Sequence, residues 1–408
     1  MRKFLPLLML LCSCQASLFD PTPRWMRMQD RNRHEAQAPD APDTVGTVKG
    51  ADIYLTAFRY PQGVDWQAHP ETPAEVVLYK NGRELLSVPT QGPPESERHR
   101  VCHGRLWTDW SDGNETVVSC DGVERFRFAG EELFRGFLEV NGMVHTLGQR
   151  QGREGFCYRV NGAELFNAPT GTLLGSADER EWEGGAFCRD SSGLYYSYGI
   201  PIQSSDGQRW EYRVMRGADL LESVPAGTAE ALFDIRVLDG IVYRSERRAG
   251  YPPTYCLVKD KLYRSLDVGP GESMHFCKLV NVNGRMLVKG YSTGVGSHIY
   301  TYWLRDPAGI PWIALSNDPI GDLISDGTHQ AHVVLNDAGL VRSLWLDREG
   351  VPFTSDTYRL ATPRCLTLKD GILGAALSRQ EGDEHLVMLD GKGTRYTFNG
   401  YFTSLVID

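Results

Sequence analysis

Apolar and polar residues alternate along most of this chain, in short runs separated by turn-forming pairs such as Asn-Gly and Asp-Gly. Alternation with a period of two predicts β-strands with one buried face, and these pairs favour two-residue type I′ hairpin turns. The first recurring turn falls at Lys49-Gly50, His103-Gly104, Asn141-Gly142, Ser192-Gly193, Asp239-Gly240, Asn283-Gly284, Asp326-Gly327 and Asp370-Gly371. Its glycines are separated by about 38 to 54 residues, which sets the length of one repeating unit.

A second hairpin turn lies between successive copies of the first. Its clearest copies are Asn81-Gly82, Asp121-Gly122, Asn161-Gly162, Arg216-Gly217 and Asp390-Gly391, with weaker versions between residues 259 and 350. Two hairpins per unit make four strands, and this period predicts an all-β chain folded as a β-propeller of about eight four-stranded blades. Seven blades are the alternative because the units at Gly193 and Gly327 are irregular. A sandwich array would not repeat one motif order, and solenoid coils are shorter.

The last residues of the chain continue the strand pattern after the final complete unit. The run Tyr401–Ile407 is apolar and β-branched enough to form a strand. We expect it to pair into the first blade and close the propeller, because closure leaves only short outer edges for other chains to pair with.

The N-terminus has a separate pattern. Arg2 and Lys3 precede an apolar run that ends in Leu11-Cys12-Ser13-Cys14. This resembles the signal peptide of a bacterial lipoprotein. The resemblance implies that the chain is cleaved between Ser13 and Cys14 and that Cys14 carries the lipid. The apolar run is long enough to engage the export machinery but too short to span a bilayer stably. The alternative is an ordinary secretory peptide cut near Ala16.

This reading divides the chain into residues 1–13 as the signal peptide, 14–43 as the lipidated cysteine and a flexible tether, and 44–408 as the propeller. Prolines and charges dominate the tether, so it lacks the apolar surface that would offset its ordering entropy. The residue after Cys14 is Gln15 and not the Asp that would retain a lipoprotein in the inner membrane. The acidic stretch that often follows the cysteine in surface-exposed lipoproteins is also absent. We therefore expect an outer-membrane anchor, with the periplasmic face preferred over the cell surface.

The composition narrows the range of partners. The chain has 408 residues and a formal net charge of −9. This mildly acidic net charge argues against binding to nucleic acid and against binding of anionic lipid by a polybasic segment. The expected membrane contact is therefore the N-terminal lipid alone. The oligomeric state is left open.

Seven of the nine cysteines fall in the repeating region. Export to an oxidising compartment allows disulfides, and the neighbouring pairs are Cys102–Cys120, Cys157–Cys188 and Cys256–Cys277. Sequence alone does not fix connectivity, and the opposing interpretation is that most of these residues are small buried side chains within strands.

Candidate ligand-binding residues are aromatic side chains in polar, loop-like surroundings and histidines next to the first hairpin turn. These residues are Trp66, Trp110, Trp182, His103 and His145. Trp side chains can stack on sugars or anchor protein interfaces. His329 and His332 would point to opposite faces of a strand, and no carboxylate or cysteine cluster completes a metal site. We predict no cofactor, no metal and no catalytic residue.

The repeated Tyr-x-Asn-Gly-x-x-Leu-Phe sequence pattern is similar to the hairpin repeats of propeller lipoproteins of the Bacteroidetes. The resemblance implies the fold and an envelope location, and it transfers no catalytic residues because the matching positions are turns. The sequence therefore favours a non-enzymatic binding or scaffold module for an envelope protein or glycan. The alternative is a carbohydrate-active hydrolase or lyase with its site at the propeller axis, which would need two converging carboxylates.

Overall fold

The computed structural model of the protein describes residues 50–91, 97–111, 113–150, 155–168, 173–174, 187–190, 193–205, 207–248, 254–259, 262–265, 272–274, 278–294, 300–305, 311–316, 320–336, 338–347, 349–355, 357–379 and 381–408. The chain divides into two units, Met1–Gln37 and Ala38–Asp408, and every described residue lies in the second. Within these ranges no helix is both long and apolar enough to cross a membrane.

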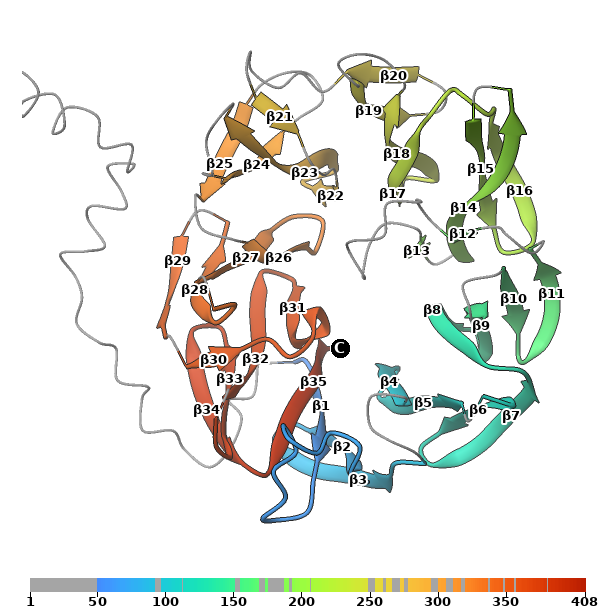
Figure 1. Ribbon diagram of the computed structural model, residues 1–408. Helices are drawn as coiled ribbons and strands as arrows, with labels where there is room; N and C mark the ends of the chain where they lie inside the picture. The colour runs from blue at the N-terminus through green and yellow to red at the C-terminus, as the bar shows by residue number, and fades with distance from the viewer. Residues whose placement is uncertain are drawn as a thin grey trace, which may run out of the picture. The chain divides into compact units, whose positions relative to one another are not determined.

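The described residues form eight small antiparallel sheets of four or five strands (Figure 1). Sheet 1 contains β1 (Ile53–Arg59), β2 (Glu75–Lys80), β3 (Arg83–Pro89) and β35 (Gly400–Ile407). Sheet 2 contains β4 (Glu97–Cys102), β5 (Arg105–Ser111), β6 (Glu115–Cys120) and β7 (Val123–Ala129). Sheet 3 contains β8 (Glu132–Val140), β9 (Met143–Arg150), β10 (Phe156–Val160) and β11 (Ala163–Asn167). Sheet 4 contains β12 (Leu173–Leu174), β13 (Phe187–Asp190), β14 (Gly193–Ser204), β15 (Gly207–Arg216) and β16 (Asp219–Val224).

The second half of the unit repeats the arrangement. Sheet 5 contains β17 (Ala231–Leu238), β18 (Ile241–Arg248), β19 (Thr254–Lys259) and β20 (Leu262–Ser265). Sheet 6 contains β21 (Glu272–Met274), β22 (Lys278–Val282), β23 (Arg285–Gly294), β24 (Tyr300–Arg305) and β25 (Pro311–Ser316). Sheet 7 contains β26 (Ile320–Ser325), β27 (Gln330–Leu335), β28 (Val341–Leu346) and β29 (Glu349–Thr354). Sheet 8 contains β30 (Tyr358–Arg359), β31 (Leu366–Lys369), β32 (Ile372–Arg379), β33 (Glu384–Leu389) and β34 (Lys392–Thr397), with the short 3-10 helix η4 (Pro363–Cys365) before β31.

The turn chemistry expected from the sequence is present in both hairpins of the repeat. Asn81 and Gly82 have φ angles of 50° and 80°, and Asn141 and Gly142 have φ angles of 51° and 74°. Both central residues of a type I′ turn require a positive φ, which explains the Asn-Gly and Asp-Gly pairs. The Asn81 Oδ1 atom also accepts a 2.8 Å hydrogen bond from the backbone nitrogen of Ile53, so the turn residue fixes the start of a neighbouring strand.

Neighbouring sheets pack together mainly through β4, β8, β13, β17, β22, β26, β31 and β35, which we call the joining strands (Figure 1). Most joining strands are irregular. The pairing register shifts within β8, β17, β26 and β35, and the strand at this place is split in two in sheets 4, 6 and 8. Such bulges bend a strand and redirect its side chains.

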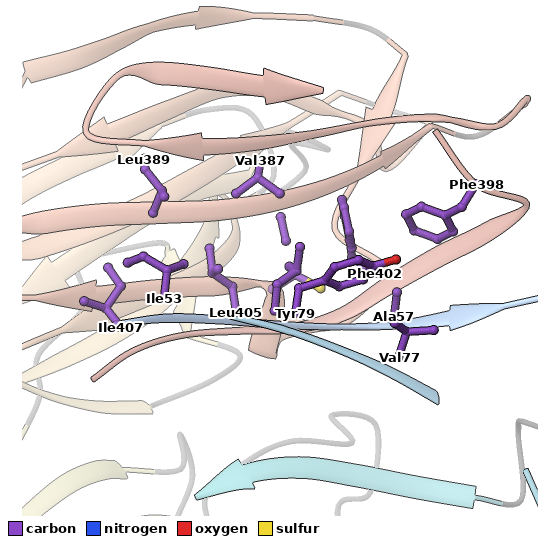
Figure 2. Close-up of a cluster of buried hydrophobic side chains, with 13 residues drawn as sticks. Ile53, Ala57, Val77, Tyr79, Val387, Leu389, Phe398, Phe402, Leu405 and Ile407 are labelled. Carbon is purple, nitrogen blue, oxygen red and sulfur yellow. The ribbon is translucent and has the colours of Figure 1, made fainter. Parts of the chain in front are cut away.

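The core consists of apolar clusters between neighbouring sheets. Figure 2 shows the cluster between sheets 1 and 8, where Val387 and Leu389 of β33 face Ile53 and Leu405. Phe402 of β35 lies in the same cluster and is fully buried. A sheet with two apolar faces is stable only when both faces are covered, and packing between sheets provides that cover.

The C-terminal strand pairs with the first strand of the described chain, as the sequence predicts. β35 is antiparallel to β1, with Ile407 opposite Ile53 and Gly400 opposite Arg59. Sheet 1 therefore combines the two ends of the described chain. Because β35 also contacts β31 and β4, sheet 1 lies between sheets 8 and 2.

Candidate functional site

The two histidines selected from the sequence have separate local partners. His103 occupies the β4–β5 turn with a φ of 49°, and its Nδ1 atom lies 3.9 Å from the Glu139 carboxylate. His145 of β9 forms a 2.6 Å hydrogen bond between Nδ1 and the Tyr158 hydroxyl, and burial lowers its pKa. Tyr158 of the neighbouring strand β10 explains His145 without a ligand, whereas His103 is exposed and its contact is with β8 of the next sheet.

The candidate tryptophans also differ in their surroundings. Trp66 is half-buried against Tyr60 and Tyr401, with ring centroids 5.9 and 4.9 Å away, so it packs on its own sheet. Trp110 is half-buried near the end of β5. Trp182 lies outside the described residues. Trp66 and Trp110 therefore belong to different sheets and share no contact among the described residues.

Two of the expected cysteine pairings are not formed in the structure. Cys120 and Cys157 are buried free thiols. Cys102 and Cys120 lie on β4 and β6, which β5 separates, while Cys157 and Cys188 belong to different sheets. Two strand spacings of about 4.8 Å exceed the distance that a disulfide spans between Cα atoms.

Burial raises the pKa of Cys120 to about 11 and that of Cys157 to about 12, which suppresses the thiolate. Cys365 in η4 is also a buried free thiol. Cys277 lies outside the described residues, and so do Cys14 and the tether. Among the described residues, no group of three His, Cys, Asp or Glu side chains could hold a metal ion.

A cluster of charged residues that the sequence analysis did not select lies on β4 and β5. Arg98 and Arg100 are two positions apart on β4, so their side chains share a face, and Arg98 pairs in register with Asp109 of β5. Arg100 donates a 2.6 Å hydrogen bond from Nη2 to the Asp109 carboxylate, and both side chains are buried. Arg100 also stacks over Phe137 of β8, with its guanidinium carbon 4.5 Å from the ring centroid.

Two further arginines from distant parts of the chain join this cluster. Arg135 is the extra residue of the bulge in β8, and its Nε donates a 2.9 Å hydrogen bond to Oε1 of Gln149. Arg364 of η4 donates a 3.1 Å hydrogen bond from Nη1 to the backbone oxygen of His99. We call Arg98, Arg100, Arg135, Arg364 and Asp109 the arginine cluster.

Charge interactions connect the members of the arginine cluster. Burial lowers the pKa of Arg98, the Arg100 and Arg135 charges lower it further, and Asp109 opposes the change. Burial raises the pKa of the Asp109 carboxyl, while the neighbouring guanidinium groups act against that rise. Arg98, Arg100 and Arg364 thus all act on the Asp109 carboxylate, and Arg135 acts on Arg98.

His99 lies between Arg98 and Arg100 in sequence but faces the other way, toward sheet 1. Its ring packs edge-on against Phe58 at 4.9 Å, and Nε2 makes a short hydrogen bond to the Thr403 hydroxyl. The Thr403 hydroxyl also lies 2.9 Å from that of Thr56. Burial, followed by the charges of Arg364 and Arg100, lowers the pKa of His99 to about 3, so this imidazole is neutral at physiological pH.

The other buried carboxylates on the joining strands and their neighbours are bound to arginines. Glu132 of β8 is paired with Arg159 at 2.9 Å. Glu246 of β18 is paired with Arg244 at 2.9 Å and with Arg248 at 2.7 Å. These carboxylates neutralise neighbouring cations and support the packing of the sheets.

The comparisons with known proteins give structural neighbours of low sequence identity. No family model and no curated protein matches the sequence. Among solved structures, BamB from Moraxella catarrhalis is 11% identical with a TM-score of 0.43, over 85% of this chain and 91% of that one. The dihydro-heme d1 dehydrogenase NirN is 8% identical with a TM-score of 0.49, over 87% and 74%. Pyrococcus horikoshii acylaminoacyl peptidase is 10% identical with a TM-score of 0.43, over 85% of this chain but about half (52%) of the peptidase. At this level the neighbours assign neither activity nor ligand to the chain.

Proposed function

We propose that the protein is a membrane-tethered binding or scaffold module of the cell envelope, built as a closed eight-bladed β-propeller. Each of the eight sheets would be one blade. Contacts from β31 to β35 and from β35 to β4 support closure, because they place the last and first blades side by side. The lipoprotein-like N-terminus supports an anchor at Cys14 in the outer membrane, facing the periplasm.

The observation that carries the binding function is the arginine cluster on the joining strands. Arg98, Arg100 and Arg135 come from β4 and β8, and Arg364 comes from η4, so segments distant in sequence converge at one place. Propellers and other scaffolds hold ligands where loops and strand ends of several units meet. A concentration of guanidinium groups there suits recognition of an acidic protein or glycan surface.

The chemistry of the described residues favours binding over catalysis. A glycoside hydrolase needs one carboxylic acid and one carboxylate about 5 to 10 Å apart, on either side of the substrate. Glu132 and Glu246 are instead neutralised by Arg159 and by Arg244 with Arg248. The alternative function, an envelope hydrolase or lyase, has no comparable observation in its favour.

The test uses the full chain with Cys14 and a C-terminal tag, purified from detergent-solubilised envelopes and analysed by mass spectrometry. A partner in stoichiometric amount is the expected result, and a Cys14→Ala variant should leave the membrane fraction while keeping the partner in vitro. Recovery of the protein alone, together with hydrolysis of an envelope glycan, would overturn the proposal.

A further inference from the structure

Positive charge in the arginine cluster exceeds negative charge among its described members. Asp109 is the carboxylate of the cluster: it is bound directly to Arg100, and the charges of Arg98 and Arg364 also act on it. Partly buried cations are costly unless an anion or hydrogen-bond acceptor compensates them. Burial, together with the charges of Arg100 and Arg135, lowers the pKa of Arg98 against the opposing effect of Asp109.

Arg98 differs from the other three arginines. Arg100 is held by Asp109 and by the Phe137 ring, Arg135 by Gln149, and Arg364 by the backbone oxygen of His99. Arg98 is half-buried, and within the described ranges it makes no hydrogen bond or ion pair. If this position were purely structural, we would expect a carboxylate partner for Arg98 or an apolar side chain in its place. A guanidinium group without a hydrogen-bond partner, next to arginines that have theirs, is suited to bind a ligand.

From this arrangement we infer an oxyanion-binding site in which Arg98 grips a phosphate or carboxylate group of the ligand. The inference rests on the proposed binding function and names its chemistry. The planar guanidinium offers two parallel N–H donors that match two oxygens of such a group. Arg100 and Arg135 act as positioning residues that set the local field, because their own donors already engage Asp109 and Gln149.

The residues around Arg98 and Arg100 also favour an oxyanion-binding site. His99 on the opposite face of β4 is neutral and hydrogen-bonded to Thr403, so it neither adds nor removes charge at physiological pH. The apolar ring of Phe137 shields one side of the Arg100–Asp109 pair from water. Charge-assisted hydrogen bonds strengthen as water is excluded, so a half-buried arginine binds an oxyanion more tightly than an exposed one.

The test is direct binding of small anions to the purified full chain, at constant ionic strength and pH 7. Inorganic phosphate and glutarate distinguish the two oxyanion types, and chloride controls for ionic screening. Thermal unfolding and calorimetric titration are recorded for the wild type, for Arg98→Gln and for the matched control Arg83→Gln. Arg83 is an exposed arginine on the outer strand β3.

We expect phosphate, glutarate or both to raise the melting temperature of the wild type and of Arg83→Gln. Arg98→Gln should weaken binding about tenfold or more, because one charge-assisted bidentate contact is lost. The same variant should be at least as stable as the wild type in chloride alone, since it removes a partly buried charge. This result separates loss of the site from loss of the fold.

Equal anion responses in the wild type and in Arg98→Gln would overturn the inference, as would no response to either oxyanion above that to chloride. Neither result would contradict the proposed scaffold function. If the wild type and Arg98→Gln both recovered a partner from envelopes, the binding surface would lie elsewhere on the protein. Loss of the partner by Arg98→Gln but not by Arg83→Gln would join the two proposals.

Discussion

The buried imidazole of His99 makes a strong prediction about stability at low pH. In the folded protein its pKa falls to about 3, mainly because burial penalises the charged ring and also because Arg364 and Arg100 repel it. In the unfolded chain the pKa of histidine is about 6.5. As the pH falls below about 6.5, the unfolded chain gains a proton that the folded protein does not take up. The stability that His99 contributes is therefore complete above this pH and is lost progressively toward pH 3.

The magnitude follows from the two pKa values. Each pKa unit corresponds to about 1.4 kcal/mol of differential stabilisation. A pH of 5 is about 1.5 units below the pKa of the unfolded imidazole, which is therefore largely protonated, whereas folded His99 remains neutral. The free energy of unfolding should therefore be about 2 kcal/mol lower at pH 5 than at pH 7 through this residue alone.

The assay is urea unfolding of the wild type and of His99→Asn at pH 7 and pH 5, in a buffer free of phosphate. Asparagine keeps a polar group near Thr403 but does not titrate in this range. His385 is also buried with a lowered pKa, and its contribution cancels in the comparison because both proteins contain it. The wild type should lose about 2 kcal/mol more than the variant between the two pH values. An equal loss in both proteins would refute the assignment of a neutral, water-excluded imidazole at this position.

Three further predictions concern stability and reactivity. Glu246→Ala should cost at least about 2 kcal/mol in urea unfolding, because it removes the fully buried carboxylate that Arg244 and Arg248 share and leaves Arg244 with Glu222. Glu84→Ala at an exposed ion pair should cost less than about 1 kcal/mol, and similar values for the two variants would contradict the packing role of Glu246. Gly400→Ala would push a Cβ into the backbone of β1, so it should lower stability by at least about 2 kcal/mol more than Gly63→Ala, where a positive φ is the only constraint; equal melting temperatures would argue against this strand pairing. In native protein Cys157, with a pKa of about 12, should react with a thiol reagent about a thousandfold more slowly than in urea, and rapid native labelling would show that this thiol is not buried.

The hairpin pattern was readable from the sequence because its chemistry is local. Asn-Gly and Asp-Gly pairs impose positive φ angles on two adjacent residues, and the structure has these angles at Asn81, Asn141 and Asp370 with their glycines. The C-terminal strand was predictable for a related reason, since an unpaired apolar run needs a sheet edge. Period and turn chemistry together were enough to predict many small antiparallel sheets.

Two of the three candidate cysteine pairings, Cys102–Cys120 and Cys157–Cys188, are not formed, because closeness in sequence is not closeness in space. Cys102 and Cys120 are 18 residues apart, yet an intervening strand keeps them two strand spacings apart. The arginine cluster was not predictable for the opposite reason, because Arg364 contacts His99 of β4 across 265 residues of sequence. One signal was available, since Arg98 and Arg100 alternate with His99 in a strand and must share a face.

The position of the arginine cluster links ligand binding to the pairing of the chain ends. His99 of β4 bonds Thr403 of β35, and Thr362 donates a 2.7 Å hydrogen bond to the Thr403 backbone oxygen, just before η4 presents Arg364. The bulge at Thr403 in β35 therefore lies against the same strand that carries Arg98. A change that loosens β35 from β1 moves both Thr403 and η4, and so displaces Arg364 from the cluster. An anion bound by Arg98 should in turn favour the paired state of β35, because ligands stabilise the conformation to which they bind more tightly.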